Sequence, residues 1–238
     1  MSYTQGHYDL LDAFAQDACP VCRLTLASVT RYINAVNYES AGDPGIRQQL
    51  RASLGFCNEH GYQWLGAAHV LGTAQIYIEV LGRATDELRG LFDHRRHLLA
   101  GVASFLGVRP DHATCGNECS PVAPTGRCLV CVVRDTTGQK LVSTVVQDIA
   151  EPSFLAAYVT SAGLCLPHLR LALCRASSEE AFRILRDTAI AGEARLRAQL
   201  QEIVRKHDYR FSHQPSGEER GAGDRAVHHV AGAHGIGE

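Results

Sequence analysis

The 238-residue chain is 45% hydrophobic and only 7% aromatic, which argues against general disorder and permits one large domain or two small ones. Its formal net charge of -2 at pH 7 provides no global positive field to attract nucleic acid or anionic lipid. The longest mostly apolar stretch, residues 98–108, is too short to span a bilayer. Residues 1–17 contain no basic segment followed by an apolar run, so the sequence predicts no secretory signal, no membrane association and a cytoplasmic protein.

The chain begins with two predicted helices. The first covers residues 7–17, where apolar residues recur three and four positions apart. Its predicted buried face is formed by Tyr8, Leu11, Phe14 and Ala15. The second helix runs from Cys19 to about Ser40 and has Pro20 at its first position, where proline is well tolerated.

Turn residues divide the next part of the chain. Asp43 and Pro44 predict an N-cap and a first helical position, and Gly55 ends the short helix that they start. A further helix opens at residues 57–60. From Trp64 the pattern stays helical to about residue 106, with a break expected near Gly72 because each glycine costs about 1 kcal/mol relative to alanine.

The second half of the chain repeats the signals of the first half. Glu151-Pro152 corresponds to Asp43-Pro44, and Gly163 corresponds to Gly55, at an offset of 108 residues. Serines and glutamates at 177–180 cap a long helix that ends near Lys206. Its predicted buried stripe consists of Ile184, Leu185, Ala189, Leu196 and Leu200. The polar tail that follows contains a short predicted helix around residues 218–230.

No segment shows convincing strand alternation, so the predicted fold is all-α. We interpret the repeated signals as an internal duplication that produces two similar helical lobes of about four helices each. The expected boundaries are 1–107 for the first repeat, 108–126 for a linker rich in Pro, Gly, Ser and Thr, 127–212 for the second repeat and 213–238 for the tail.

One cysteine pattern occurs twice. Each copy is C-x2-C, followed about 35 positions later by C-x2-H. The first copy is Cys19, Cys22, Cys57 and His60, and the second is Cys128, Cys131, Cys165 and His168. A lone C-x2-C can be core packing, but a second copy at matching spacing favours metal. Three cysteines and a histidine form a common closed tetrahedral zinc set.

We therefore expect two zinc ions per chain, each bound within one lobe by one copy of the pattern. Grouping across the lobes, such as Cys19 and Cys22 with Cys165 and His168, stays open, because a fourfold longer loop costs only about 1.2 kcal/mol more to close. Four ligands per set favour structural over catalytic zinc. Iron–sulfur ligation is a less favoured alternative.

Redox chemistry is another alternative. Both C-x2-C pairs lie at predicted helix starts, where the helix dipole favours thiolates, and nine cysteines in a cytoplasmic chain suit metal or redox chemistry better than disulfides. However, the βαβ pattern of thioredoxin-like proteins is missing, and the second copy has Leu129 where the first has Pro20.

The other cysteines and one charged, aromatic segment are weaker candidates for functional residues. Cys115 and Cys119 lack a fourth ligand and are interpreted as loop thiols, whereas Cys174 is predicted to lie in the core. The charged and aromatic segment from Arg205 to His213 fits either a nucleic-acid contact or a helix end that docks back through Tyr209 and Phe211. We favour docking.

Several motifs resemble those of a bacterial protein family of unknown function. They are CPVCRL at residue 19, GFCNEH at residue 55, CLVC at residue 128, GLCLPHL at residue 163 and, most specifically, KHDYRFSH at residue 206. The resemblance covers about residues 8–232. It implies a bacterial cytosolic protein with paired Cys/His motifs and brings no established activity.

The leading hypothesis is a non-enzymatic, zinc-stabilised helical protein that binds a partner, with a protein partner favoured over nucleic acid. The alternatives are a thiol-redox or metal-dependent enzyme acting in the cleft between the lobes, and nucleic-acid binding through Arg205 to Arg210.

Overall fold

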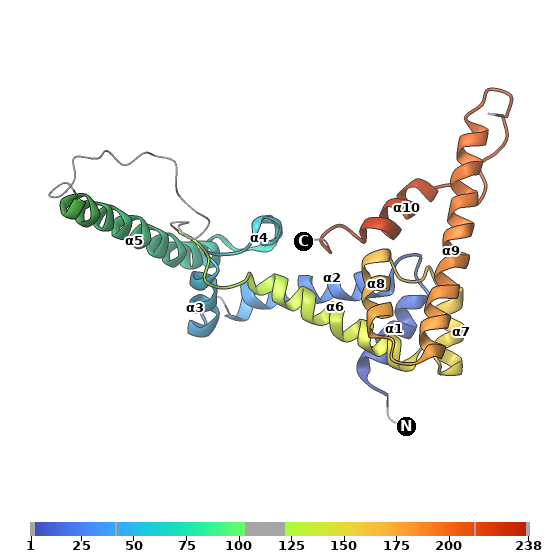
Figure 1. Ribbon diagram of the computed structural model, residues 1–238, viewed down its shortest axis with the longest axis horizontal. Helices are drawn as coiled ribbons and strands as arrows, with labels where there is room; N and C mark the ends of the chain where they lie inside the picture. Colours follow the sequence, from blue (N-terminus) through green and yellow to red (C-terminus); the bar gives the residue numbers. More distant parts are fainter. Residues whose placement is uncertain (1–2, 41, 103–121, 212, 237–238) are drawn as a thin grey trace. The chain divides into compact units, whose positions relative to one another are not determined.

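The computed structural model describes residues 3–40, 42–102, 122–211 and 213–236, and all regular structure in these ranges is helical, as predicted (Figure 1). The helices are α1 (Gln5–Phe14), α2 (Pro20–Ala35), the π-helix η1 (Val36–Ser40), α3 (Pro44–Ala52), α4 (Asn58–Ala67), α5 (Val70–Val102), α6 (Leu129–Asp148), α7 (Pro152–Thr160), α8 (Leu166–Arg175), α9 (Glu179–Lys206) and α10 (Ala222–Ala231). None of the described helices is long and apolar enough to cross a membrane.

The chain divides into two compact units. Unit 1 consists of residues 1–30 and 133–238, and unit 2 consists of residues 31–132. The units therefore separate within α2 and α6, and not at the expected boundaries near residues 107 and 127. The reason is that the first turns of α2 pack on α6 inside unit 1, although one helix comes from each expected repeat. Val21 lies in one core with Val142 and Val145.

The caps predicted from the sequence are confirmed in both halves of the chain. Asp43 accepts a hydrogen bond from the Ile46 backbone N–H at 2.9 Å, and Glu151 accepts one from the Phe154 backbone N–H at 2.6 Å. Each cap precedes a proline at the start of its helix. Gly55 and Gly163 have φ values of 87° and 72°, a left-handed conformation that glycine adopts without strain. These signals place α4 and α8 directly after α3 and α7.

The core of unit 1 includes a face of α1 that differs from the predicted one. His7, Leu10 and Phe14 are buried, whereas Tyr8 is 52% exposed. The prediction missed His7 because a histidine is polar, but its Nδ1 lies 2.8 Å from the Asp148 carboxylate and its ring stacks on Tyr3. A satisfied polar side chain can be buried at little cost.

Unit 2 is organised around Trp64, which is fully buried and is the only tryptophan in the sequence. Its ring stacks on Phe56 with centroids 5.1 Å apart, and its Nε1 donates to the Thr73 hydroxyl at 3.0 Å. α4 ends at Ala67 and α5 begins at Val70, so the break expected near Gly72 lies earlier in the chain.

The side chain of Asn37 explains where that break falls. Its Nδ2 donates to the Ala67 carbonyl at 2.9 Å, and its Oδ1 accepts from the His69 backbone N–H at 3.0 Å. These two bonds satisfy backbone groups that the interruption releases. α5 then continues through Gly72 and Gly82 without interruption.

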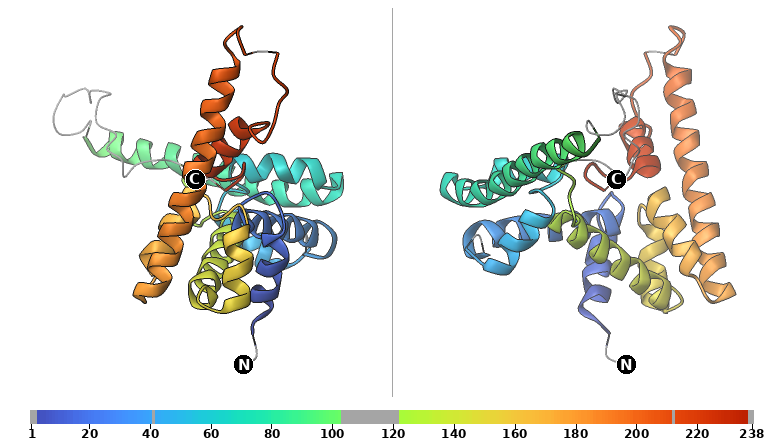
Figure 2. Two further views of the ribbon diagram at one scale, coloured as in Figure 1. Left: turned by 90° about the vertical axis from the view of Figure 1, so that its right-hand side faces the viewer. Right: turned by 60° about the vertical axis from the view of Figure 1, so that its left-hand side comes forward.

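The C-terminal part of unit 1 folds back on itself. Ser178 caps α9 as predicted, by accepting from the Ala181 backbone N–H at 3.1 Å. α10 packs against α8 and α9 (Figures 1 and 2). Between α9 and α10, Phe211 lies under the Arg205 guanidinium, 4.7 Å from its ring centre. Tyr209 is 85% exposed, so its predicted docking is wrong.

Glu219 connects the segment before α10 to the end of α9. Its carboxylate accepts from Lys206 Nζ at 2.7 Å and from the Gly217 backbone N–H at 2.9 and 3.0 Å. These bonds, that of Lys206 first, lower the pKa of Glu219 from 4.5 to about 2. Because the folded pKa is depressed, the stabilisation is complete above about pH 4.5 and is lost as the pH falls towards 2.

Replacing Glu219 with Gln is therefore expected to loosen this connection even at neutral pH, because the amide carries no charge to pair with Lys206. Amide hydrogen exchange of residues 217–231 should become faster in Glu219→Gln than in the wild type. Glu218→Gln, which changes an exposed neighbour, is the matched control. Equal protection in all three proteins would show that the Lys206 pair does not hold the segment.

Candidate metal centres

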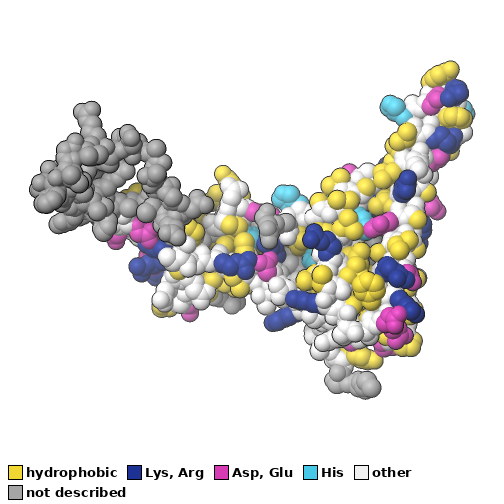
Figure 3. All heavy atoms as spheres, in the orientation of Figure 1, with side chains coloured by type: hydrophobic (Ala, Val, Ile, Leu, Met, Phe, Trp, Pro, Cys, Tyr) yellow, Lys and Arg dark blue, Asp and Glu magenta, His cyan; other side chains and the backbone are white. Residues whose placement is uncertain are grey.

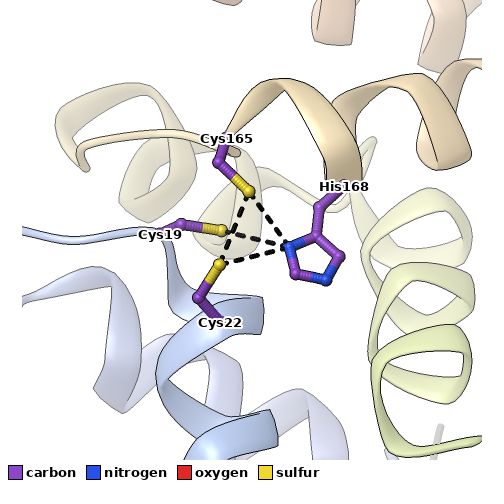
Figure 4. Close-up of side chains that lie close together, drawn as sticks. All are labelled: Cys19, Cys22, Cys165 and His168. Carbon is purple, nitrogen blue, oxygen red and sulfur yellow. Dashed lines mark hydrogen bonds between the residues drawn. The ribbon is translucent and has the colours of Figure 1, made fainter. Parts of the chain in front are cut away.

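The first Cys/His cluster lies in unit 1 and joins the starts of two helices. Cys19 and Cys22 come from the start of α2, and Cys165 and His168 from the start of α8; Figure 4 shows the four side chains pointing toward one another. His168 Nδ1 lies 3.7, 3.4 and 3.1 Å from the sulfurs of Cys19, Cys22 and Cys165. The sulfurs of Cys22 and Cys165 are 3.5 Å apart.

The second cluster has the same construction and lies in unit 2. Cys57 and His60 come from the start of α4, and Cys128 and Cys131 from the start of α6. His60 Nδ1 lies 3.1, 3.7 and 3.3 Å from the sulfurs of Cys57, Cys128 and Cys131. The sulfurs of Cys57 and Cys131 are 3.6 Å apart.

All eight predicted ligands are thus gathered into clusters, but the grouping is across the two copies of the pattern and not within them. The expectation of local grouping is wrong. α2 leaves unit 1 after Thr30 and carries the chain into unit 2, so Cys57 and His60 lie in a different unit from Cys22. The difference in loop-closure free energy that favoured local grouping is small. The packing of α2 on α6 outweighs that difference.

The separations in both clusters suit one tetrahedral ion. With Zn–S bonds of about 2.3 Å and Zn–N bonds of about 2.0–2.1 Å, tetrahedral ligands lie about 3.5–3.8 Å from one another. Within each cluster the four ligand atoms lie within 4.8 Å of one another. Three ligands of the first cluster are buried and Cys19 is partly exposed; in the second, Cys57 and Cys131 are partly exposed. Each cluster can therefore hold a metal ion.

Without a cation, the first cluster stabilises one thiolate. Hydrogen bonds from the Cys165 and Cys22 thiols hold the pKa of Cys19 well below its usual value, although burial opposes the shift. The bond to Cys19 in turn raises the pKa of Cys165 to about 12. In the second cluster, burial raises the pKa of Cys131 to about 12. A divalent cation stabilises every thiolate around it, so metal binding would release the protons that these thiols retain.

A cavity of about 530 Å³ lies beside the first cluster, inside unit 1. Cys19, Cys22 and Cys165 line it together with residues of α9 and α10. This volume is typical of small-molecule pockets, which measure about 300–1,000 Å³.

The other candidate residues lie apart from the clusters. Cys115 and Cys119 are outside the described residues. Cys174 is exposed, so its predicted core position is wrong: it lies on α8 away from the buried Ala172. Sequence reasoning also missed Thr25, a buried polar residue whose only sequence signal is its position one helical turn after Cys22.

The helices and the two clusters define a class of protein: a helical chain in which two Cys/His sets can each hold a metal ion. The chain belongs to a family of unknown function, DUF6062, whose model matches residues 1–235. The expected resemblance to a family of unknown function is thereby confirmed. No curated protein and no solved structure matches the chain.

Proposed function

We propose that this protein is a zinc-stabilised helical scaffold that acts by binding a protein partner. In this proposal both clusters hold zinc and neither performs catalysis. The observation that carries the proposal is the complete set of four soft or borderline ligands in each cluster. Catalytic zinc keeps one position open for water or substrate, and three thiolates with one imidazole leave none.

A closed site of this kind would act as a cross-link between two helices. Each one would join the start of a C-x2-C helix to the start of a C-x2-H helix, α2 to α8 in unit 1 and α6 to α4 in unit 2. The matching ligands, caps and glycines of the two halves support an internal duplication in which the repeats exchanged their C-x2-H segments.

A binding role is supported by a second apolar surface on α5. Ile76 and Val80 face the core of unit 2, but Leu71, Ile78, Leu81 and Leu88 are 70, 71, 63 and 56% exposed. With Ala74 and Thr85, which are also exposed, their spacing alternates between three and four residues, the pattern by which one helix packs along another. We call these four residues the α5 stripe.

Nucleic-acid binding has less support. Arg205 pairs with Glu202, Lys206 with Glu219, and Arg210 with Asp208, so these cations already have carboxylate partners. Basic and acidic side chains are interspersed along the exposed part of α9 seen in Figure 3. A surface of mixed sign gives little attraction for a phosphate backbone.

The test compares affinity purification with the wild type and with Ile78→Lys/Leu81→Glu, which interrupts the α5 stripe without changing the net charge. Ile190→Lys/Val204→Glu on α9 is the matched control, since both of its target side chains are also exposed. We expect a partner that the wild type and the control retain and the stripe variant loses, while all three proteins carry about two zinc ions per chain by elemental analysis. A partner set unaffected by the stripe substitutions, or iron in place of zinc, would overturn the proposal.

A further inference from the structure

The cavity beside the first cluster has no role in the proposed scaffold. It has a volume of about 530 Å³ and is lined by α2, α9, α10 and the segment of residues 160–165, so it lies within unit 1. Leu26, Leu164 and Leu196 give it an apolar lining. Small-molecule sites combine apolar walls of this kind with a few fixed polar groups that select the ligand. The polar groups of the lining therefore indicate which ligand fits.

Arg225 on α10 brings a fixed positive charge to this lining. Its guanidinium donates to the Arg220 and Glu218 backbone carbonyls and to the Gln199 side-chain oxygen, each at 2.9 Å. These three acceptors are uncharged, so they hold the guanidinium in place without neutralising it, and they occupy three of its five N–H groups. Arg225 is partly buried, where an unneutralised charge costs more than it does in water. An anion in the cavity would supply the missing negative charge.

Two further arginines line the cavity, Arg23 from α2 and Arg195 from α9. Both are exposed, and neither side chain forms a hydrogen bond or an ion pair with any other residue in the described ranges. The cavity thus receives guanidinium groups from three helices, and within the described part of the chain none of them is paired with a carboxylate.

Three carboxylates line the cavity as well. Glu193 already pairs with His229, at 3.2 Å. Asp17 and Glu218 are exposed side chains on the segments before α2 and α10, and neither forms an ion pair with an arginine of the lining. Of the charged groups that have no partner of opposite charge, only Arg225 is fixed by hydrogen bonds, so the ordered charge on the lining is positive.

We propose that this cavity binds a small amphiphilic anion, an organic molecule with an apolar body and one carboxylate or phosphate group. The head group pairs with Arg225, because a guanidinium matches the geometry of both kinds of oxyanion. The apolar body lies against Leu26, Leu164 and Leu196. This site goes beyond the scaffold role, because it gives the protein a small-molecule ligand at a place separate from the α5 stripe.

The test uses anilinonaphthalene sulfonate, an aromatic anion that becomes fluorescent in apolar sites, as the probe with the full-length protein. We expect one saturable site from which octanoate or octyl phosphate displaces the probe, and the better competitor identifies the head group. Octylamine, which has the same chain and a positive charge, should displace the probe at least about tenfold less well. Equal displacement by all three competitors, or by none, would overturn the proposal.

Two arginine variants test the charges of the lining. Arg225→Gln is expected to weaken probe and octanoate binding by about tenfold or more, because it removes the fixed charge. Arg195→Gln should weaken binding by up to about fivefold, since an exposed guanidinium contributes less. Arg197→Gln, which changes an exposed arginine of α9 outside the cavity, is the matched control and should leave the affinity unchanged.

A larger side chain at Gly192 tests the location of the probe. Gly192 lines the cavity, and a Cβ atom there would meet nothing within 4 Å, so a phenylalanine can be introduced without a backbone clash. We expect Gly192→Phe to abolish displaceable probe binding, whereas Gly223→Phe, at an open position of α10 outside the cavity, retains it.

Two outcomes would overturn the cavity site, whether or not Arg225→Gln folds. One is unchanged affinity in both Gly192→Phe and Arg195→Gln. The other is loss of probe binding in Ile78→Lys/Leu81→Glu, which would assign the probe to the α5 stripe.

Discussion

Removing the metal is expected to unfold both units of the protein. Structural zinc contributes about 10–16 kcal/mol of apparent binding energy in small peptides, whereas the net stability of a whole domain is about 5–15 kcal/mol. The chain is only 7% aromatic, so few large side chains are present to hold the helices together without the ions. Loss of the ions would also leave a first cluster in which the ionised Cys19 raises the pKa of the Cys22 and Cys165 thiols.

The measurement is far-UV circular dichroism and Trp64 fluorescence during titration with a strong chelator. Trp64 is fully buried in unit 2 and is the only tryptophan, so its emission reports that unit alone. We expect most of the helical signal to disappear, the emission to shift to that of exposed tryptophan, and both to recover when zinc is added back. Magnesium is the control, because thiolate ligands do not suit it. A chelated chain that keeps both signals would show that the clusters are not structural.

Two double variants should bind different numbers of ions, depending on how the ligands are grouped. Cys22→Ala/Cys165→Ala removes two ligands of the first cluster and leaves the second cluster complete. Cys22→Ala/Cys57→Ala removes one ligand from each cluster and leaves neither complete. We expect one chelator-resistant zinc ion in the first variant and none in the second, since a closed structural site needs all four ligands.

Local grouping within each copy of the pattern predicts the reverse. Cys22 and Cys57 would then belong to one site and Cys165 to the other, so the second variant would keep one ion and the first would keep none. Trp64 fluorescence adds an independent reading: its emission should stay native in Cys22→Ala/Cys165→Ala, because the second cluster lies in the same unit as Trp64. The Cys22→Ala/Cys174→Ala variant controls for the number of cysteines removed. It should also retain the ion of the second cluster, because Cys174 belongs to neither cluster.

The sequence by itself determined the local features of this protein. Asp43, Glu151 and Ser178 cap their helices as predicted, because a cap depends on a side chain and a backbone N–H only three residues away. The eight ligands were identified for a similar reason: C-x2-C and C-x2-H bring two donors together within a single turn. The all-helical class followed from periodicity in the same way.

Only the tertiary structure decided which partners these local elements have. The grouping of Cys22 with Cys165, and not with Cys57, depends on the packing of α2 on α6, whose contacts are more than 100 residues apart in sequence. The burial of His7 requires Asp148, and the end of α4 requires Asn37. No local sequence pattern predicts either of these contacts. Closing such long loops differs by only about 1 kcal/mol between alternatives, so the choice belongs to side-chain packing and to hydrogen bonds that form after the helices meet.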